Sequence, residues 1–106
     1  MDVSVVIVSY NTQALLAACV DSVFDREPDG LSVEVIVVDN ASSDDSVAFL
    51  REHYGERITV VASETNDGFA AGNNLGFEVA QGRHVLLLNS DARLEGDVLA
   101  RMVQFS

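Results

Sequence analysis

The chain has 106 residues, enough for one domain, and 48% of them are hydrophobic against 22% charged, which is typical of a globular protein. Its formal net charge is −11, and its six basic residues are all arginine. The absence of lysine excludes a Walker phosphate-binding loop and Schiff-base chemistry, and the acidic balance argues against nucleic acid as a partner. An anionic ligand would need another source of positive charge, for which a divalent metal ion is the natural candidate.

The cysteine content and the hydropathy pattern bear on the cellular location. A single cysteine, Cys19, excludes a disulfide framework within the chain and is expected in the core. The amino terminus lacks the basic segment and cleavage site of a signal peptide, and no apolar run approaches the roughly 20 residues that span a membrane. We therefore expect a cytoplasmic protein.

The first half of the chain predicts two units of a strand followed by a helix. Val3–Ser9 is nearly continuous in apolar character, which is typical of a strand covered on both faces in a parallel sheet. Thr12–Phe24 carries an apolar stripe at helical spacing that includes Leu15. Val33–Asp39 repeats the buried-strand pattern and Ser43–Tyr54 the helical one.

The second half predicts the same alternation twice more. Ile58–Ala62 is a short strand, and Phe69–Gln81 is a helix with glycine or alanine at every fourth position, which suits close packing on a sheet. Gly82 is expected to end that helix. His84–Leu88 predicts a further buried strand, and Val98–Phe105 a final helix.

The alternation of strands and helices predicts an α/β fold with a Rossmann-like, mostly parallel sheet of about four strands and helices on both faces. Right-handed crossovers favour the strand order 3-2-1-4, in which the direction of winding reverses between the first and fourth strands. A ligand crevice is expected at that point, at the carboxyl ends of the strands. The polar residues expected there are Ser9, Tyr10, Asn11, Asp39, Asn89, Ser90 and Asp91.

Two carboxylates at predicted strand ends are the strongest candidates for chemistry. Asp39 is either a turn or capping residue, or an acceptor for a ribose hydroxyl or a base N–H. Asn89-Ser90-Asp91 is either an Asx turn or a metal–phosphate site. Mg²⁺ and Mn²⁺ prefer oxygen ligands, usually one or two carboxylates together with substrate phosphates, so Asp91 is the candidate metal ligand.

The glycine-faced helix adds further candidates at its start. Asn66-Asp67-Gly68 is a tight turn at a helix N-terminus, where free N–H groups favour an anion. The helix glycines are best explained by close packing. Of the neighbours Asn73 and Asn74, we expect one to line the pocket and the other to face solvent. No Gly-x-Gly-x-x-Gly pattern follows the first strand, which argues against an ordinary dinucleotide-binding domain.

Three motifs together resemble the amino-terminal half of a family 2 glycosyltransferase of the GT-A type, a family that uses nucleoside-diphospho-sugar donors. They are VSVVIVSYN, VIVVDNASSD and NDGFAAGNNLGFEVAQGRHVLLLNSDA, in family order and spacing. The third is most similar to the rhamnosyltransferase-like subgroup. The resemblance implies that the whole chain, residues 1–106, is the donor-binding part of a GT-A domain.

The resemblance also implies residue roles. The loop from Ser9 to Asn11 would hold the nucleotide, Asp39 would contact its base or ribose, and Asp91 would be the last aspartate of a DXD-type motif that binds Mn²⁺ or Mg²⁺. Asn89 stands where that motif has its first aspartate. The implied donor is a UDP- or dTDP-sugar.

The implied reaction is inverting transfer to a hydroxyl of a glycan or lipid-linked acceptor, at the inner face of the membrane in the full-length enzyme. The catalytic base of the family lies beyond the segment that matches here, so the resemblance predicts that this chain alone is inactive. Two alternatives stay open: a non-catalytic α/β module that self-associates through an exposed sheet edge, and a nucleotide-binding domain without transferase activity.

Overall fold

The structure is a computed structural model that describes residues 2–9, 13–25, 30, 32–40, 46–63 and 68–89. The predicted helix Val98–Phe105 lies outside these residues. The elements, in chain order, are β1 (Val3–Ser9), α1 (Gln13–Asp25), β2 (Val33–Asn40), α2 (Ser46–Tyr54), a short 3₁₀ helix η1 (Gly55–Arg57), β3 (Thr59–Ser63), α3 (Phe69–Val79) and β4 (His84–Asn89).

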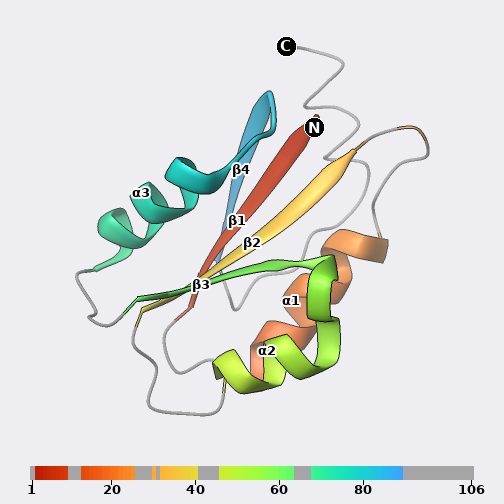
Figure 1. Ribbon diagram of the computed structural model, residues 1–106, viewed down its shortest axis with the longest axis vertical. Coiled ribbons are helices and arrows are strands. Elements are labelled where there is room, and N and C mark those ends of the chain that lie inside the picture. Colours follow the sequence, from red (N-terminus) through yellow and green to blue (C-terminus); the bar gives the residue numbers. More distant parts are fainter. Residues whose placement is uncertain are drawn as a thin grey trace.

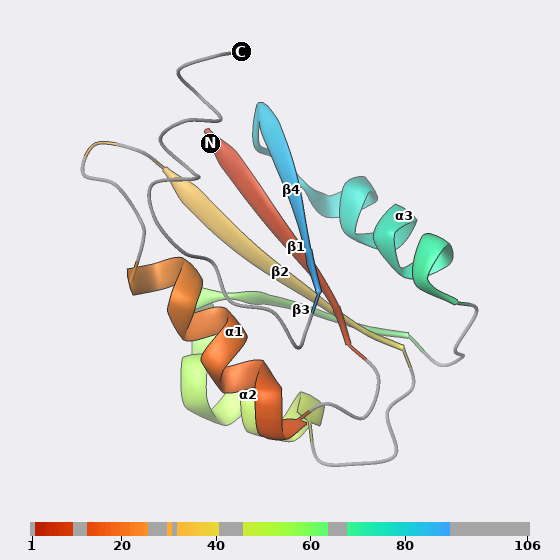
Figure 2. The same cartoon turned by 180° about the vertical axis from the view of Figure 1, so that it is seen from behind.

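The four strands form one sheet in the order β3-β2-β1-β4, and each neighbouring pair is parallel. Helices α1 and α2 cover one face of the sheet and α3 covers the other (Figures 1 and 2). The predicted α/β class, strand order and two-sided helix cover are therefore confirmed. Because the strands are parallel, all four carboxyl ends lie at the same edge.

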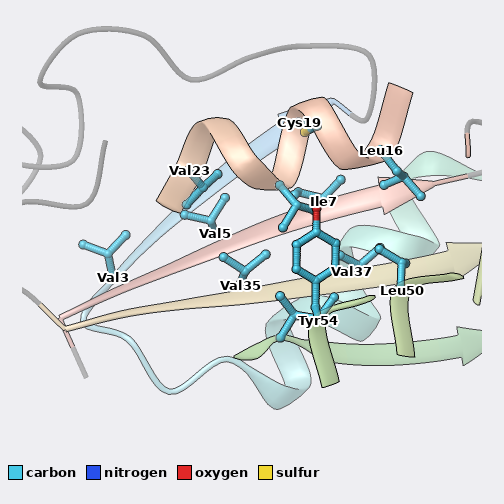
Figure 3. Packing of buried hydrophobic residues seen from close by; sticks show 12 residues of the cluster. Val3, Val5, Ile7, Leu16, Cys19, Val23, Val35, Val37, Leu50 and Tyr54 are labelled. Carbon is cyan, nitrogen blue, oxygen red and sulfur yellow. The ribbon is translucent and has the colours of Figure 1, made fainter. Parts of the chain in front are cut away.

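The larger core lies between the sheet and the pair α1 and α2 (Figure 3). Alternate side chains of β1 and β2, such as Ile7 and Val37, pack there against Leu16 of α1 and Leu50 of α2. Cys19 is fully buried in this cluster, as the apolar stripe predicts. These side chains lose nearly all contact with water, which is the main favourable contribution to folding.

Tyr54 closes the same core from the end of α2. Its hydroxyl donates a hydrogen bond of 2.8 Å to Asp21 Oδ1 on α1. Burial of the ring, and then the neighbouring Asp21 carboxylate, raise the pKa of the phenol well above its ordinary value. The phenol is therefore held protonated as a donor that ties α2 to α1.

The opposite face is made by the small residues of α3. A Cβ added at Gly72 would lie 2.7 Å from Val8 Cγ1, and one at Gly76 would overlap Val6 Cγ1. Both valines point from β1 toward the helix, so the backbone of α3 rests directly on the sheet. The packing explanation for the two helix glycines is thus confirmed.

Three expectations about individual elements are wrong. Helix α3 ends at Val79 with Ala80 already extended, so Gly82 does not end it. The backbone of Gly82 instead presses against β1, where an added Cβ would lie 2.5 Å from the Ser4 nitrogen. Leu15 is 49% exposed rather than part of the core, because it lies at the edge of the buried stripe of α1.

The third correction concerns β4, which was expected to be buried on both faces. Leu86 and Leu88 pack against the larger core, but Val85 and Leu87 on the other face are 36% and 43% exposed. The physical reason is the position of α3, which contacts chiefly β1 and β2, so that this face of β4 is only partly covered by the described residues. Phe77 and Val79 of α3 add exposed apolar surface.

Candidate functional site

The carboxyl ends of β1 and β2 bring Ser9 and Asp39 together. The two residues are register partners in the parallel ladder, and they are 0% and 2% exposed. Asp39 is also the register partner of Ala62 on β3. A carboxylate so thoroughly removed from water needs partners, and it can only accept hydrogen bonds, which suits recognition of hydroxyl or N–H groups.

Asn40 is a buried polar residue at this edge of the sheet that the sequence did not predict as part of the site. Strand β2 runs one residue further than predicted, so Asn40 falls on the face of the sheet that α3 covers. It is 4% exposed, and its Nδ2 donates to the carbonyl of Gly68 at 3.1 Å. The sequence spacing did indicate this position. Asn40 lies two residues after Val38 and four after Ile36, so all three side chains fall on the face of the strand that α3 covers.

Gly68 positions the start of α3 at this edge. Its φ of 95° and ψ of 174° belong to a region open essentially only to glycine. Its carbonyl accepts both from Asn40 and from the backbone N–H of Gly72, the latter at 3.1 Å. The amino terminus of α3, where a helix favours negative charge, is thereby tethered to the end of β2.

Asn73 lies in the second turn of the same helix and is 7% exposed, whereas Asn74 is exposed. The exposure of Asn74 matches the expectation that one of the pair faces solvent, and the burial of Asn73 leaves it as the candidate for the pocket. The Oδ1 of Asn73 is buried and has no hydrogen-bond partner among the residues that the structure describes. Buried acceptors without a partner are uncommon, and a helical side chain leans toward the helix amino terminus, here the carboxyl edge of the sheet.

The structure leaves part of the predicted site undescribed. Tyr10, Asn11, Asn66, Ser90 and Asp91 lie outside the described residues. Asn89 is the last residue of β4, and its backbone pairs with Val8 on β1. The ends of β2 and β4 therefore flank the end of β1, as the predicted strand order requires.

The described residues contain no group of three or more histidine, cysteine, aspartate or glutamate side chains that could hold a metal ion. In the part of the chain that the structure describes, no helix has the length and apolar character needed to cross a membrane.

The parallel four-stranded sheet in the order 3-2-1-4, with helices on both faces, is a fold shared with solved GT-A glycosyltransferases. The sequence profile of glycosyl transferase family 2 matches residues 4–106. The chain therefore belongs to glycosyl transferase family 2.

Two relatives illustrate the similarity in sequence. The putative teichuronic acid biosynthesis glycosyltransferase TuaG of Bacillus subtilis is 37% identical over 97% of this chain and 41% of its own length. The succinoglycan biosynthesis protein ExoO of Rhizobium meliloti is 32% identical over 97% of this chain and 29% of its own length. The chain thus spans well under half the length of these relatives.

Two solved structures share the fold. S. aureus TarS 1-349 in complex with UDP-GlcNAc superimposes with a TM-score of 0.88, at 25% identity, over 99% of this chain and 31% of that one. The mannosyltransferase PcManGT of Pyrobaculum calidifontis, in complex with GDP-Man and Mn²⁺, gives a TM-score of 0.81 at 26% identity, over 90% and 29% of the two chains.

Proposed function

We propose that this chain is the donor-binding part of an inverting glycosyltransferase, which transfers a sugar from a nucleoside-diphospho-sugar to a hydroxyl acceptor. The observation that carries the proposal is Asp39, a buried carboxylate beside Ser9 at the carboxyl edge of a GT-A sheet. The similarity to TarS with bound UDP-GlcNAc supports a nucleotide-sugar as the ligand. The acceptor site and the catalytic base are proposed to lie outside residues 1–106.

The proposed nucleotide contacts fall into three groups. The first is Ser9 at the end of β1 with Tyr10 and Asn11 after it in the sequence, and the second is Asn89 at the end of β4 with Ser90 after it. The third is Gly68 and Asn73 in the first turns of α3, with Asn66 before them in the sequence. Asp39 would accept from the ribose or the base. The unpartnered Oδ1 of Asn73 supports its place in this set, since an N–H or O–H donor on the nucleoside would satisfy it.

The proposed metal ligand is Asp91, in the position of the last aspartate of a DXD-type motif. Mn²⁺ bound by PcManGT beside GDP-Man supports a divalent cation in this family, and Mg²⁺ has the same preference for oxygen. When bound, the ion would neutralise the diphosphate leaving group. That role also accounts for how a chain of net charge −11 without lysine could accept an anionic donor.

The proposal extends to the donor, the acceptor and the cellular location. The motif Asn66–Ala92 favours a rhamnosyltransferase-like enzyme that uses a dTDP- or UDP-sugar. The acceptor would be a glycan or a lipid-linked acceptor, in line with TuaG and ExoO, which are named for the biosynthesis of teichuronic acid and of succinoglycan. A cytoplasmic location, at the inner face of the membrane in the full-length enzyme, fits a chain whose single cysteine, Cys19, is buried in the core.

Calorimetric titration of the chain with UDP and with dTDP, each with and without Mn²⁺, tests the proposal. We expect heat of binding with at least one nucleotide and tighter binding when Mn²⁺ is present. Inorganic pyrophosphate with Mn²⁺ is the control, because it offers the phosphates without the nucleoside and should bind more weakly. Absence of heat with both nucleotides, in a sample shown to be folded by circular dichroism, would contradict the proposal.

A second candidate is a non-catalytic module that self-associates through β4. The exposed side chains of Val85 and Leu87 on this edge strand favour it, because exposed apolar strands promote pairing between chains. Light scattering over a wide concentration range should then show a dimer or larger species whose proportion rises with concentration. A monomer throughout that range would exclude this candidate and leave the donor-binding proposal untouched.

A further inference from the structure

The sequence of β4 does not by itself specify how the strand pairs with β1. Four consecutive residues, Val85 to Leu88, are aliphatic, so both faces of the strand are apolar. A shift of one residue would exchange Leu86 and Leu88 in the core for Val85 and Leu87, one aliphatic pair for another. Strand register is normally set by the alternation of polar and apolar residues, and β4 lacks that alternation.

A polar cluster on the α3 side, at the amino end of the sheet, supplies a different constraint. Ser4 of β1 and Glu34 of β2 are register partners, and the Ser4 hydroxyl donates to Glu34 Oε2. The backbone N–H of Gln81 donates to the same carboxylate oxygen at 2.7 Å, and that of Gly82 donates to Ser4 Oγ at 2.8 Å. These two donors belong to the connection that leads from α3 into β4.

Gly82 makes this contact specific to one residue. A Cβ at its position would lie 2.5 Å from the Ser4 nitrogen and 2.6 Å from Ser4 Oγ. If β4 slipped by one position, Gln81 or Arg83 would take the place of Gly82 against β1. While Glu34 and Ser4 hold this connection against β1, either side chain would clash with the β1 backbone, so a slip requires that hold to be lost.

We infer that Glu34, together with Ser4 and Gly82, sets the register of β4 against β1 and is thereby a positioning residue for the opposite end of that strand. Asn89 reaches its place beside Val8 only in the native register. A slip of one residue would move the strand end by about 3.3 Å along the strand and turn each side chain to the other face. The effect on ligand binding rests on the proposed function; the effect on register does not.

The test is to measure the pairing of β1 with β4 by nuclear Overhauser effects in the isotope-labelled chain. The unmodified protein should show contacts that pair Val6 with Leu87. In Glu34→Ala we expect contacts from Val6 to Leu86 or Leu88 to appear in addition to, or in place of, those to Leu87. The pairing of β1 with β2 should persist. Glu34→Gln keeps an oxygen acceptor and should retain the native set.

A second variant restores the missing pattern. Adding Val85→Thr and Leu87→Thr to Glu34→Ala makes β4 alternate, so a slip would bury two hydroxyls, and the native register should return. Asp2→Ala is the matched control, since it removes the Asp2 carboxylate, whose Oδ2 accepts from the Ser32 N–H at 2.8 Å at the same edge. The contact of Asp2 with β4 runs through its backbone carbonyl, which accepts from the His84 N–H at 3.1 Å and is kept in alanine. This variant should leave the β1–β4 contacts unchanged.

The pairing of β4 in these variants decides whether Glu34 sets its register. If Glu34→Ala shows only the native pairing of β4 with β1, the inference is overturned. It is also overturned if the alternating variant slips or does not fold, because the native pairing should return in that variant. If Glu34→Ala does not fold but the alternating variant does, the inference is supported. Titration of the same samples should show loss of the Mn²⁺-dependent part of nucleotide binding in Glu34→Ala. If the unmodified chain binds no nucleotide, the proposed function fails while the register result stands.

Discussion

Replacing Gly76 with alanine is expected to lower the free energy of unfolding by about 1–3 kcal/mol, the usual cost of forcing one extra carbon into a packed core. The new methyl group would overlap Val6, which is fully buried and has a stiff, β-branched side chain. Alanine gains about 1 kcal/mol over glycine in helix propensity, so the sign of the result decides whether packing or propensity dominates. Urea unfolding followed by circular dichroism measures it.

Asn74→Ala provides the control on the same helix. Asn74 is exposed, so its replacement changes helix propensity without adding atoms to the core. We expect that variant to be as stable as the parent or slightly more stable. A Gly76→Ala protein that unfolds at the same or a higher urea concentration than the parent would show that α3 can move away from β1, against the packing described above.

The second large effect is expected for Asp39→Asn, which should weaken nucleotide binding about tenfold to a hundredfold, the range for losing a hydrogen bond to a charged group. The amide retains one acceptor oxygen but loses the charge and replaces the other oxygen with a donor. Asp39 is 2% exposed at the end of β2, so water cannot readily substitute for the lost acceptor. Calorimetric titration with the nucleotide that the parent chain binds best gives the change directly.

Glu78→Gln is the matched control for charge. Glu78 is exposed on α3, and its substitution removes the same single negative charge from a chain of net charge −11. Less net repulsion of an anionic nucleotide predicts unchanged or slightly tighter binding in Glu78→Gln. Equal affinities in a folded Asp39→Asn and in the parent would remove Asp39 from the site.

The candidate site was predictable where it depends on strand order. Short apolar runs alternating with helical patterns imply a parallel sheet, and a parallel sheet brings Ser9 and Asp39 to one edge whatever the details of packing. Asn40 could not be assigned in the same way, because its role depends on β2 continuing one residue further and on where Gly68 lies in space. Strand ends are the least certain feature of any pattern in a sequence.

The sequence alone also indicated that the helix glycines serve close packing. Glycine destabilises a helix, so its presence there is explained when the missing side chain lets the helix approach a neighbouring element. It could not show that Gly82 serves the sheet instead of ending the helix, because the atoms that exclude a side chain there belong to Ser4 and Val3, about 80 positions earlier in the chain.

The exposure of β4 was likewise decided only by the tertiary structure. Its aliphatic run reads as a strand buried on both faces, and the local sequence carries no sign that one face lies open. Burial depends on which helix lies above a strand, and α3 lies over β1 and β2 instead. Local order in this protein follows from residue spacing, whereas burial and register follow from contacts between segments far apart in the chain, which no local pattern encodes.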